Sequence, residues 1–310
     1  MTTQRSDTAP TDSFDAPDAD VQARSLAETD PGSLHGAFRP GLTSRLGIAV
    51  GRALPRGRTG LKLAGLAQPL AMSALKNGVA DIEVLGMKLR LHPLDNLSEK
   101  RAFLTPQCFD AVELDTLRAA MGPGKTFIDI GANAGLYSLV AAKAGGRAAR
   151  VIAVEPQDEM RRRLAYNART NGLDNIEISG VALADYEGES VMRLVGDNRG
   201  GTQLGAGQAG SASHAHAVRV TMLATLLAEM RVAKLDVMKI DVEGGELAIL
   251  APFFANVARE RWPDLIIMER PAINKVEASR DALSLACSRG YRVETETHAN
   301  AVLKLARAQD

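Results

Sequence analysis

The residues best suited to chemistry lie around one glycine turn. Gly131, Asn133 and Gly135 follow the apolar run 127–130, and Glu155 directly follows the next apolar run, 151–154. A glycine turn between a strand and a helix lets the backbone approach a ligand, and the first amides of the helix face that ligand. An acidic residue about twenty positions further on can accept hydrogen bonds from both hydroxyls of a ribose. This spacing predicts a nucleoside-binding crevice.

The chemistry of the loop separates two classes of nucleoside. A dinucleotide needs bare backbone under its pyrophosphate, whereas this loop has Asn133 in place of the second glycine and the carboxylate of Asp129 beside it. Both features oppose a dianion. They suit S-adenosylmethionine, which has no phosphate and carries an ammonium and a sulfonium. We therefore expect this cofactor to bind through Asp129, Gly131, Asn133, Gly135 and Glu155. The alternative is a tight strand–helix connection that binds no ligand.

A second acidic segment, Lys239 to Glu246, has the sequence Lys-Ile-Asp-Val-Glu-Gly-Gly-Glu. Together with the glycine loop and Glu155, this segment resembles the FkbM family of S-adenosylmethionine-dependent methyltransferases, and the resemblance extends from roughly Asn96 to Val302. It implies a seven-stranded doubly wound fold and methyl transfer, most often to a hydroxyl. It leaves the acceptor open, because family members act on sugars, polyketides and other secondary metabolites.

The two central carboxylates of this segment are the candidate catalytic groups. Asp241 and Glu243 follow the predicted fourth core strand, 235–240, and ligands of doubly wound sheets bind beyond the carboxyl ends of the strands. A hydroxyl acceptor must lose its proton during transfer, so either carboxylate could act as a base or orient the hydroxyl. The alternative is structural, with both carboxylates paired to Lys239 and to the amides of the following helix.

Three further residues have open interpretations. Asp185 follows the predicted third strand, 176–179, and resembles the family position at the adenine edge. It could instead cap its own turn. His214 and His216 lie in a predicted long loop, 196–217, which is either a lid over the acceptor or the tip of a hairpin. The two histidines lack further ligands at matching spacing, so we expect no metal site.

The elements that must position these residues alternate along the chain. Strand-like apolar runs separated by helical patterns indicate a mostly parallel sheet covered on both faces. With the family resemblance, this predicts an α/β fold with a doubly wound, Rossmann-like, seven-stranded methyltransferase sheet and an N-terminal helical and hairpin appendage. The predicted boundaries are a disordered acidic tail over 1–35, a basic amphipathic segment and small hairpin over 36–95, and the methyltransferase domain over 96–310. The other predicted elements are a hairpin within 82–91, strands at 191–195, 218–222, 265–268 and 291–293, and helices at 110–120, 246–250 and 278–288.

Charge is segregated although the 310 residues carry no net charge. Residues 1–30 contain seven acidic side chains and few large apolar ones, which predicts disorder. Residues 31–80 contain seven bases and no acid, with apolar residues that predict one or two amphipathic helices broken around Pro55 and Pro69. Such a segment could contact an anionic membrane over residues 39–76 or bind an acidic partner. The alternative is a packed appendage with solvated arginines.

Composition also limits the partners and the location. Zero net charge and an aromatic content of 4% disfavour nucleic acid. The family resemblance implies a small-molecule or glycan acceptor as the partner. Lys62 and Pro69 interrupt any membrane span, and the acidic start lacks a basic signal region. We expect a cytoplasmic protein, with peripheral membrane contact as the alternative. A dinucleotide oxidoreductase and a non-catalytic binding module of methyltransferase fold are the competing functions, and the oligomeric state is left open.

Overall fold

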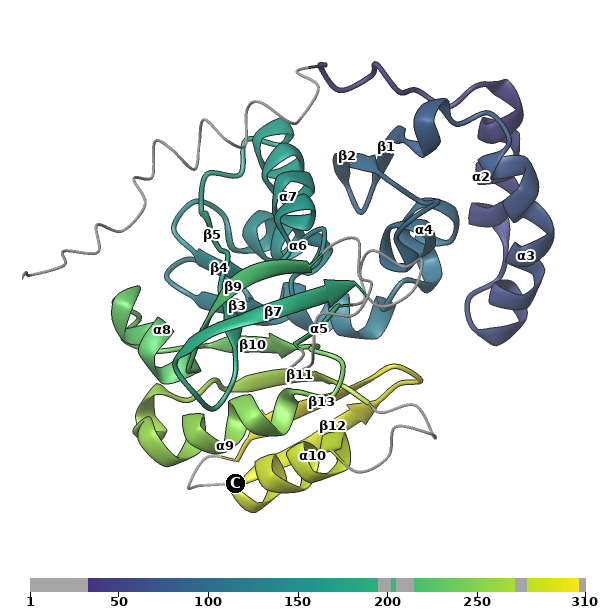
Figure 1. The fold of residues 1–310 in the computed structure, drawn as a ribbon. Coiled ribbons are helices and arrows are strands. Elements are labelled where there is room, and N and C mark those ends of the chain that lie inside the picture. Colours follow the sequence, from purple (N-terminus) through teal and green to yellow (C-terminus); the bar gives the residue numbers. More distant parts are fainter. Residues whose placement is uncertain (1–32, 195–201, 205–214, 271–277, 307–310) are drawn as a thin grey trace, which may run out of the picture. The chain divides into compact units, whose positions relative to one another are not determined.

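The computed structural model describes residues 33–194, 202–204, 215–270 and 278–306 (Figure 1). From His35 onward the chain forms one compact unit. The predicted acidic tail lies outside the described residues, apart from its last positions, and so does most of the predicted loop 196–217. None of the helices in the described part of the chain combines the length and the apolar character needed to cross a bilayer.

A seven-stranded sheet forms the centre of this unit, in the order β12, β13, β11, β10, β3, β4, β5. Its strands are β3 (Thr126–Ile130), β4 (Arg150–Val154), β5 (Ile176–Ser179), β10 (Val237–Ile240), β11 (Leu265–Glu269), β12 (Tyr291–Glu296) and β13 (Asn300–Leu305). Strands β5, β4, β3, β10 and β11 pair in parallel, and β13 is antiparallel to both of its neighbours. The strand order reverses between β3 and β10, which is where ligands of doubly wound sheets bind. The predicted fold class is confirmed.

Helices cover both faces of the sheet. The hydrophobic cluster on one face includes residues of α5 (Ala111–Ala120), α6 (Leu136–Gly145) and α7 (Asp158–Thr170). The cluster on the other face includes α8 (Leu223–Glu229), α9 (Glu246–Asn256) and α10 (Ala278–Ser288). Successive strand residues point to opposite faces, so Phe127 packs in the first cluster and Ile128 in the second. Burial on both faces explains why the strands are continuous apolar runs.

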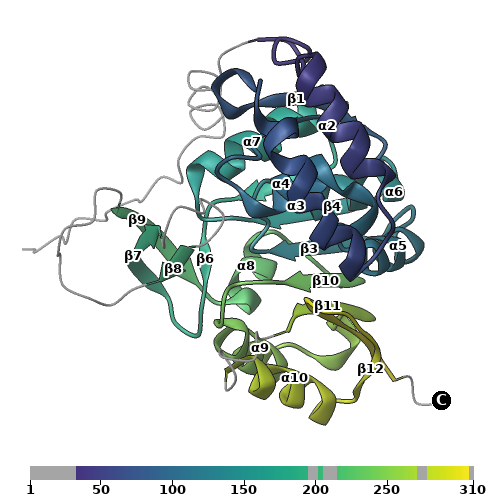
Figure 2. The same ribbon diagram turned by 90° about the vertical axis from the view of Figure 1, so that its right-hand side faces the viewer.

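A second, four-stranded sheet stands beside the carboxyl ends of the large sheet (Figure 2). It consists of β6 (Ala182–Leu183), β7 (Gly188–Leu194), β8 (Thr202–Leu204) and β9 (Ala215–Thr221). The strand-like runs predicted on either side of the long loop correspond to β7 and β9. The sequence patterns did not predict that these strands form a separate sheet, because they gave no information on pairing partners.

The N-terminal part contains a helical hairpin, a strand hairpin and a short helix. Its elements are α2 (Leu42–Ala53), α3 (Arg58–Met72), a 3-10 turn (Lys76–Gly78), β1 (Ala80–Val84), β2 (Met87–Leu91), α4 (Leu97–Leu104) and a second 3-10 turn (Pro106–Cys108). A third 3-10 turn, Arg259–Arg261, precedes β11. The predicted strand hairpin is confirmed. Its turn residues Leu85 and Gly86 both have positive φ, 53° and 74°, as a two-residue hairpin turn requires.

The two prolines of the helical hairpin behave differently. α2 ends at Ala53, before Pro55, as predicted from the restriction that a proline places on the residue before it. The predicted break at Pro69 is wrong, because α3 continues through Pro69 to Met72. Pro69 cannot donate to the carbonyl of Gly65, but both residues are exposed, so water can satisfy that carbonyl.

Candidate active site

A cavity of about 490 Å³ opens at the carboxyl ends of β3, β4, β10 and β11. Its lining also includes residues of α4, of β7 and of the turn between β12 and β13. The volume falls in the range of about 300 to 1,000 Å³ typical of small-molecule sites. Of the predicted site residues, Gly131, Asn133, Glu155, Asp241 and Glu243 line it.

The glycines of the loop are required by close packing within the protein. Gly131 has φ +76°, and a Cβ there would lie 2.0 Å from the carbonyl oxygen of Asp241 on the neighbouring strand end. Gly135 has φ +80°, and a Cβ there would lie 2.2 Å from the side chain of Leu164 in α7. Gly135 does not line the cavity itself but starts α6 against α7. Close packing at these two glycines therefore fixes the shape of the loop.

Glu155 is held by backbone amides at the end of β4. Its carboxylate accepts hydrogen bonds from the amide of Asn133 at 2.7 Å and from that of Gln157 at 2.8 Å, one to each oxygen. Each carboxylate oxygen can accept a further hydrogen bond. Only 6% of the residue is exposed, and burial raises the pKa of the carboxyl to about 7. This buried carboxylate is available to hydroxyl groups in the cavity.

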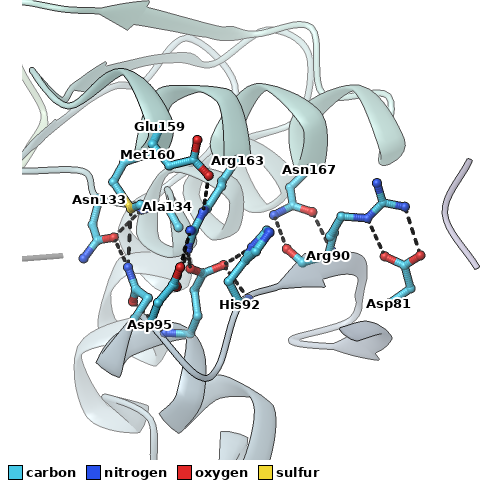
Figure 3. Close-up of polar contacts among 12 residues, drawn as sticks. Asp81, Arg90, His92, Asp95, Asn133, Ala134, Glu159, Met160, Arg163 and Asn167 are labelled. Carbon is cyan, nitrogen blue, oxygen red and sulfur yellow. Dashed lines mark hydrogen bonds and ion pairs between the residues drawn. The ribbon is translucent and has the colours of Figure 1, made fainter. Parts of the chain in front are cut away.

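Asn133 links the glycine loop to the N-terminal part of the protein. Its φ is +52°, and its Oδ1 accepts hydrogen bonds from Nδ2 of Asn96 at 2.6 Å and from the amide of Ala134 at 2.7 Å (Figure 3). The same Asn96 caps α4, because its Oδ1 accepts from the amide of Glu99 at 3.0 Å. The side chain of Asn133 is thus held by the residue that caps α4, while its backbone amide donates to Glu155.

A buried ion-pair cluster fixes α4 against α7. Arg163 donates to Glu99 at 2.7 Å and to Asp95 at 2.8 Å (Figure 3). The side chains of Arg163 and Glu99 are 4% and 0% exposed. Removal of one partner would leave a buried charge, so the cluster holds α4 in one position. Ser98 and Arg101 of α4 line the cavity, and their placement depends on this cluster.

Asp129 lies beneath the cavity and is absent from its lining. Its carboxylate is 1% exposed and accepts from the amide and the hydroxyl of Ser138 at 3.1 and 2.7 Å. Burial raises the pKa of this carboxyl, and the charge of Lys239 opposes that effect. Lys239 is the register partner of Asp129 on β10, and its Nζ lies 3.9 Å from Asp129. The structure therefore places Asp129 under α6 and outside the cavity lining, and its contact with a cofactor stays a prediction.

Lys239 connects the buried carboxylate to the cavity. Its Nζ donates to Asp241 at 3.1 Å and lies 4.9 Å from the ring centroid of Tyr137. The hydroxyl of Tyr137 in turn donates to Asp110 at 2.9 Å. The pairing with Lys239, which the structural alternative assigned to both carboxylates, is therefore present for Asp241. It leaves Asp241 accessible, because its side chain is 37% exposed.

Glu269, which the sequence analysis missed, completes this end of the cavity. It is the last residue of β11, lines the cavity and shares a hydrogen bond with Asp241. Burial and the charges of Asp241 and Glu243 raise the pKa of Glu269 to about 8. The available signal was the one used for Glu155, an acidic residue that ends an apolar strand.

The loop after Asp241 is shaped by a buried acid. Glu246 is 0% exposed, and its carboxylate accepts from the amides of Val242 and Gly244, each at 3.2 Å. Glu243 has φ +55° and an exposed side chain at the cavity edge. Of the two predicted catalytic carboxylates, Asp241 is the one that shares hydrogen bonds with Lys239 and Glu269 at the strand ends.

The remaining predicted residues lie elsewhere. Asp185 is exposed and is not among the cavity-lining residues, although Val181 and Leu183 are. His216 belongs to β9, and His214 lies outside the described residues. Within the described ranges, no group of three His, Cys, Asp or Glu side chains could hold a metal ion.

The lining of the cavity is acidic. Among the described residues it contains five carboxylates, Asp110, Glu155, Asp241, Glu243 and Glu269, and two cationic side chains, Arg101 and Lys239. Because the pKa values of Asp110, Glu155 and Glu269 are raised, the negative charge of the lining grows as the pH rises, and it opposes a pyrophosphate and favours a ligand that carries positive charge.

Comparisons with known proteins give relatives at several levels. Part of the chain is 28% identical to the AMB antimetabolite synthetase AmbE of Pseudomonas aeruginosa, in a match that covers 41% of this chain and only 8% of that protein. Among solved structures, a precorrin-6Y C5,15-methyltransferase of Geobacter metallireducens is similar over 65% of this chain and 90% of that chain, with a TM-score of 0.42 and 13% identity. A SAM-dependent O-methyltransferase of Thermotoga maritima is similar over 64% and 67%, with a TM-score of 0.39 and 14% identity. Likeness at this level assigns no substrate to this chain.

The family assignment comes from the sequence match. The methyltransferase FkbM domain matches residues 129–293, which is more than half of the chain. The matched range begins in β3. It includes Glu155 at the end of β4 and the pair formed by Asp241 and Glu269 at the ends of β10 and β11. The resemblance recognised in the glycine loop and the segment from Lys239 to Glu246 is confirmed, and the chain belongs to the FkbM methyltransferase family.

Proposed function

We propose that the protein transfers a methyl group from S-adenosylmethionine to a hydroxyl of a sugar, glycolipid or other secondary metabolite. The observation that supports this most directly is the cavity, which combines an amide-held carboxylate, Glu155, with a carboxyl pair, Asp241 and Glu269. The first group suits a ribose. The second suits an acceptor that must give up a proton.

The cavity fits the cofactor by charge and by hydrogen-bonding groups. Glu155 would accept from the ribose hydroxyls, and the backbone of Gly131 and Ala132 lies close to the same space. The acidic lining would favour the ammonium and the sulfonium. When bound, S-adenosylmethionine supplies an electrophilic methyl group and leaves as a neutral thioether. The proposal uses no metal ion.

In this proposal Asp241 takes up the acceptor's proton. Nζ of Lys239 donates to Asp241 at 3.1 Å, while the raised pKa of Glu269 keeps that neighbour protonated near neutral pH. A hydroxyl oxygen that forms a bond to the methyl carbon must lose its proton, and a carboxylate within hydrogen-bonding reach can take it. Ser98, Arg101 and Asn300, which also line the cavity, can orient an acceptor with several hydroxyls.

Two measurements test the proposal in sequence. Calorimetric titration should show binding of S-adenosylmethionine without added metal. Binding of NAD with no response to S-adenosylmethionine would refute the proposal that S-adenosylmethionine is the cofactor. Metabolite and glycan extracts incubated with methyl-labelled S-adenosylmethionine should then yield a labelled product. Tandem mass spectrometry of that product should place the label on oxygen. A label on nitrogen or carbon would refute the hydroxyl acceptor while leaving the methyltransferase activity intact.

A further inference from the structure

The helical hairpin of α2 and α3 packs through small residues. A Cβ on Gly47 would lie 2.3 Å from the backbone nitrogen of Ala71, so the two helix backbones approach closely. The buried positions of both helices are occupied mainly by small residues: Ser44, Gly47, Ile48 and Gly51 in α2, and Gly60, Ala64, Ala67 and Ala71 in α3. Apart from Ile48, no large apolar side chain of these two helices is among the buried ones.

The large apolar side chains of the hairpin point outward instead. Leu61 (38% exposed) lies two residues before Leu63 and so on another side of α3. The others form what we call the leucine face: Leu42 (81% exposed), Leu46 (60%), Val50 (45%), Leu63 (41%), Leu66 (81%) and Leu70 (38%). On α2 they are spaced by four residues, and on α3 by three and four, so each set lies along one side of its helix. Figure 2 shows the two helices side by side at the surface of the unit. The apolar pattern of both helices is therefore directed away from the core.

This arrangement is the reverse of that in a helix on the surface of a water-soluble core. Such helices bury their large apolar side chains and expose polar ones. Helices surrounded by lipid pack through small residues, which let their backbones approach, and present large apolar side chains to the hydrocarbon. Contiguous exposed apolar residues on a folded protein mark an interaction surface. The leucine face thus has the composition expected for contact with lipid.

Charge distinguishes a membrane from other partners. Residues 31–80 contain no acidic side chain, and Arg45 and Lys62 are exposed on the same two helices. A second copy bound through the same face would bring these bases against their equivalents, because a twofold interface pairs a surface with itself. An anionic lipid surface attracts them.

We propose that the α2–α3 hairpin is a membrane-docking surface that inserts its leucine face among the headgroups and upper acyl chains of an anionic bilayer. The bases beside the face contact lipid phosphates. The hairpin lies in the interface and does not span the bilayer, consistent with its two short helices of 12 and 15 residues.

Vesicle co-sedimentation with the full-length protein tests this proposal. Vesicles of equal parts phosphatidylglycerol and phosphatidylcholine should bind the protein, and pure phosphatidylcholine vesicles should bind it at least about tenfold more weakly. The double variant Leu46→Gln with Leu66→Gln should lose at least about tenfold in partitioning to the mixed vesicles. The charge-reversal variant Arg45→Glu with Lys62→Glu should bind the mixed vesicles no better than neutral ones.

Matched controls separate docking from general changes of the surface. Val112→Gln with Val293→Gln removes two exposed apolar side chains from α5 and β12, and it should bind vesicles as the unchanged protein does. Calorimetric affinity for S-adenosylmethionine should be the same in all variants, so loss of vesicle binding is distinguishable from misfolding and from failure of the proposed enzymatic function. Equal loss in the control variant would overturn the proposal. So would absence of binding to mixed vesicles, or a dimer in light scattering that the leucine-face variant abolishes without any vesicle binding.

Discussion

The ends of β4 and β10 both present carboxylates to the cavity, but the protein holds these carboxylates by different means. Glu155 at β4 is fixed by two backbone amides, which cannot change protonation state. Asp241 after β10 is held by two ionisable side chains, Lys239 and Glu269, and the pKa of Glu269 is raised to about 8. One strand, β3, separates the two ends, so they lie roughly 10 Å apart. Backbone support favours a fixed binding contact, whereas a titrating network can receive and release a proton.

The largest expected effect is at the titrating end. Asp241→Asn keeps the size of the side chain but removes its charge, so transfer to a hydroxyl should fall by about a hundredfold. Affinity for S-adenosylmethionine should change little. Steady-state kinetics with saturating cofactor measure the first effect and calorimetry the second. Glu243→Gln, in the same loop but with an exposed side chain, is the matched control and should retain most activity.

If Asp241 instead contacts the methionine ammonium, affinity and subsaturating turnover should fall together, and saturation should restore much of the rate. Wild-type affinity with wild-type transfer would remove Asp241 from both roles. In that case Glu269 becomes the next group to replace.

At the amide-held end the expected effect is on binding. Glu155→Ala removes the proposed acceptor of two ribose hydrogen bonds, so the dissociation constant for S-adenosylmethionine should rise by at least about tenfold. Transfer at saturating cofactor should largely persist. Glu177→Ala, which removes a half-exposed carboxylate from β5, should leave the affinity unchanged. An unchanged affinity for the Glu155 variant would place the ribose elsewhere.

The pH dependence of binding should report Glu155 directly. Its pKa is raised to about 7 by burial, and in the proposed complex ribose hydroxyls would donate to the ionised form. As the pH falls below about 7, protonation competes with the ligand, so the dissociation constant should rise by up to about tenfold per pH unit. Glu155→Gln cannot titrate and should show weaker binding without this inflection. The same dependence in both proteins would assign the titration to another group.

The raised pKa of Glu155 also makes folding stability depend on pH, in the direction opposite to that of cofactor binding. Between the ordinary value of 4.5 and about 7, the folded protein retains a proton at Glu155 that the unfolded chain releases. The contribution of this group to the free energy of unfolding therefore falls as the pH rises through that window. Denaturation midpoints of the wild type and of Glu155→Gln, compared across this pH range, measure it.

A smaller effect on cofactor affinity should come from Asn96, which holds Asn133 in place beside Glu155. Asn96→Ala removes the hydrogen bond to Asn133, whose amide positions Glu155, and affinity for S-adenosylmethionine should fall by about threefold. It also removes the cap of α4. Asn96→Asp keeps the capping oxygen but not the donor, so it should show the same loss of affinity with a smaller loss of thermal stability. If Asn96→Asp binds normally, Asn96 acts only as a cap.

Sequence patterns predicted the parts of this molecule that depend on neighbours along the chain. Continuous apolar runs identified most strands of the large sheet, because a strand buried on both faces has few polar positions. The glycine loop and Glu155 were predicted from spacing alone, since a turn and the strand that follows it are set by local geometry. Asp241 was placed at the cavity because it directly follows a buried strand.

Tertiary structure decided which of these residues share a surface. Register between β3 and β10, which are about a hundred residues apart in sequence, puts Asp129 beside Lys239 and under α6. The parallel alignment of β11 with β10 brings Glu269 to Asp241, and the packing of α4 on α7 brings Asn96 to Asn133. Asp185 lies outside the cavity lining for the same kind of reason, since the course of the chain after β6 is set by pairing with β9. The exposure of the leucine face was likewise not determined by sequence, because small residues and leucines alternate around both helices and only packing decided which side faces inward.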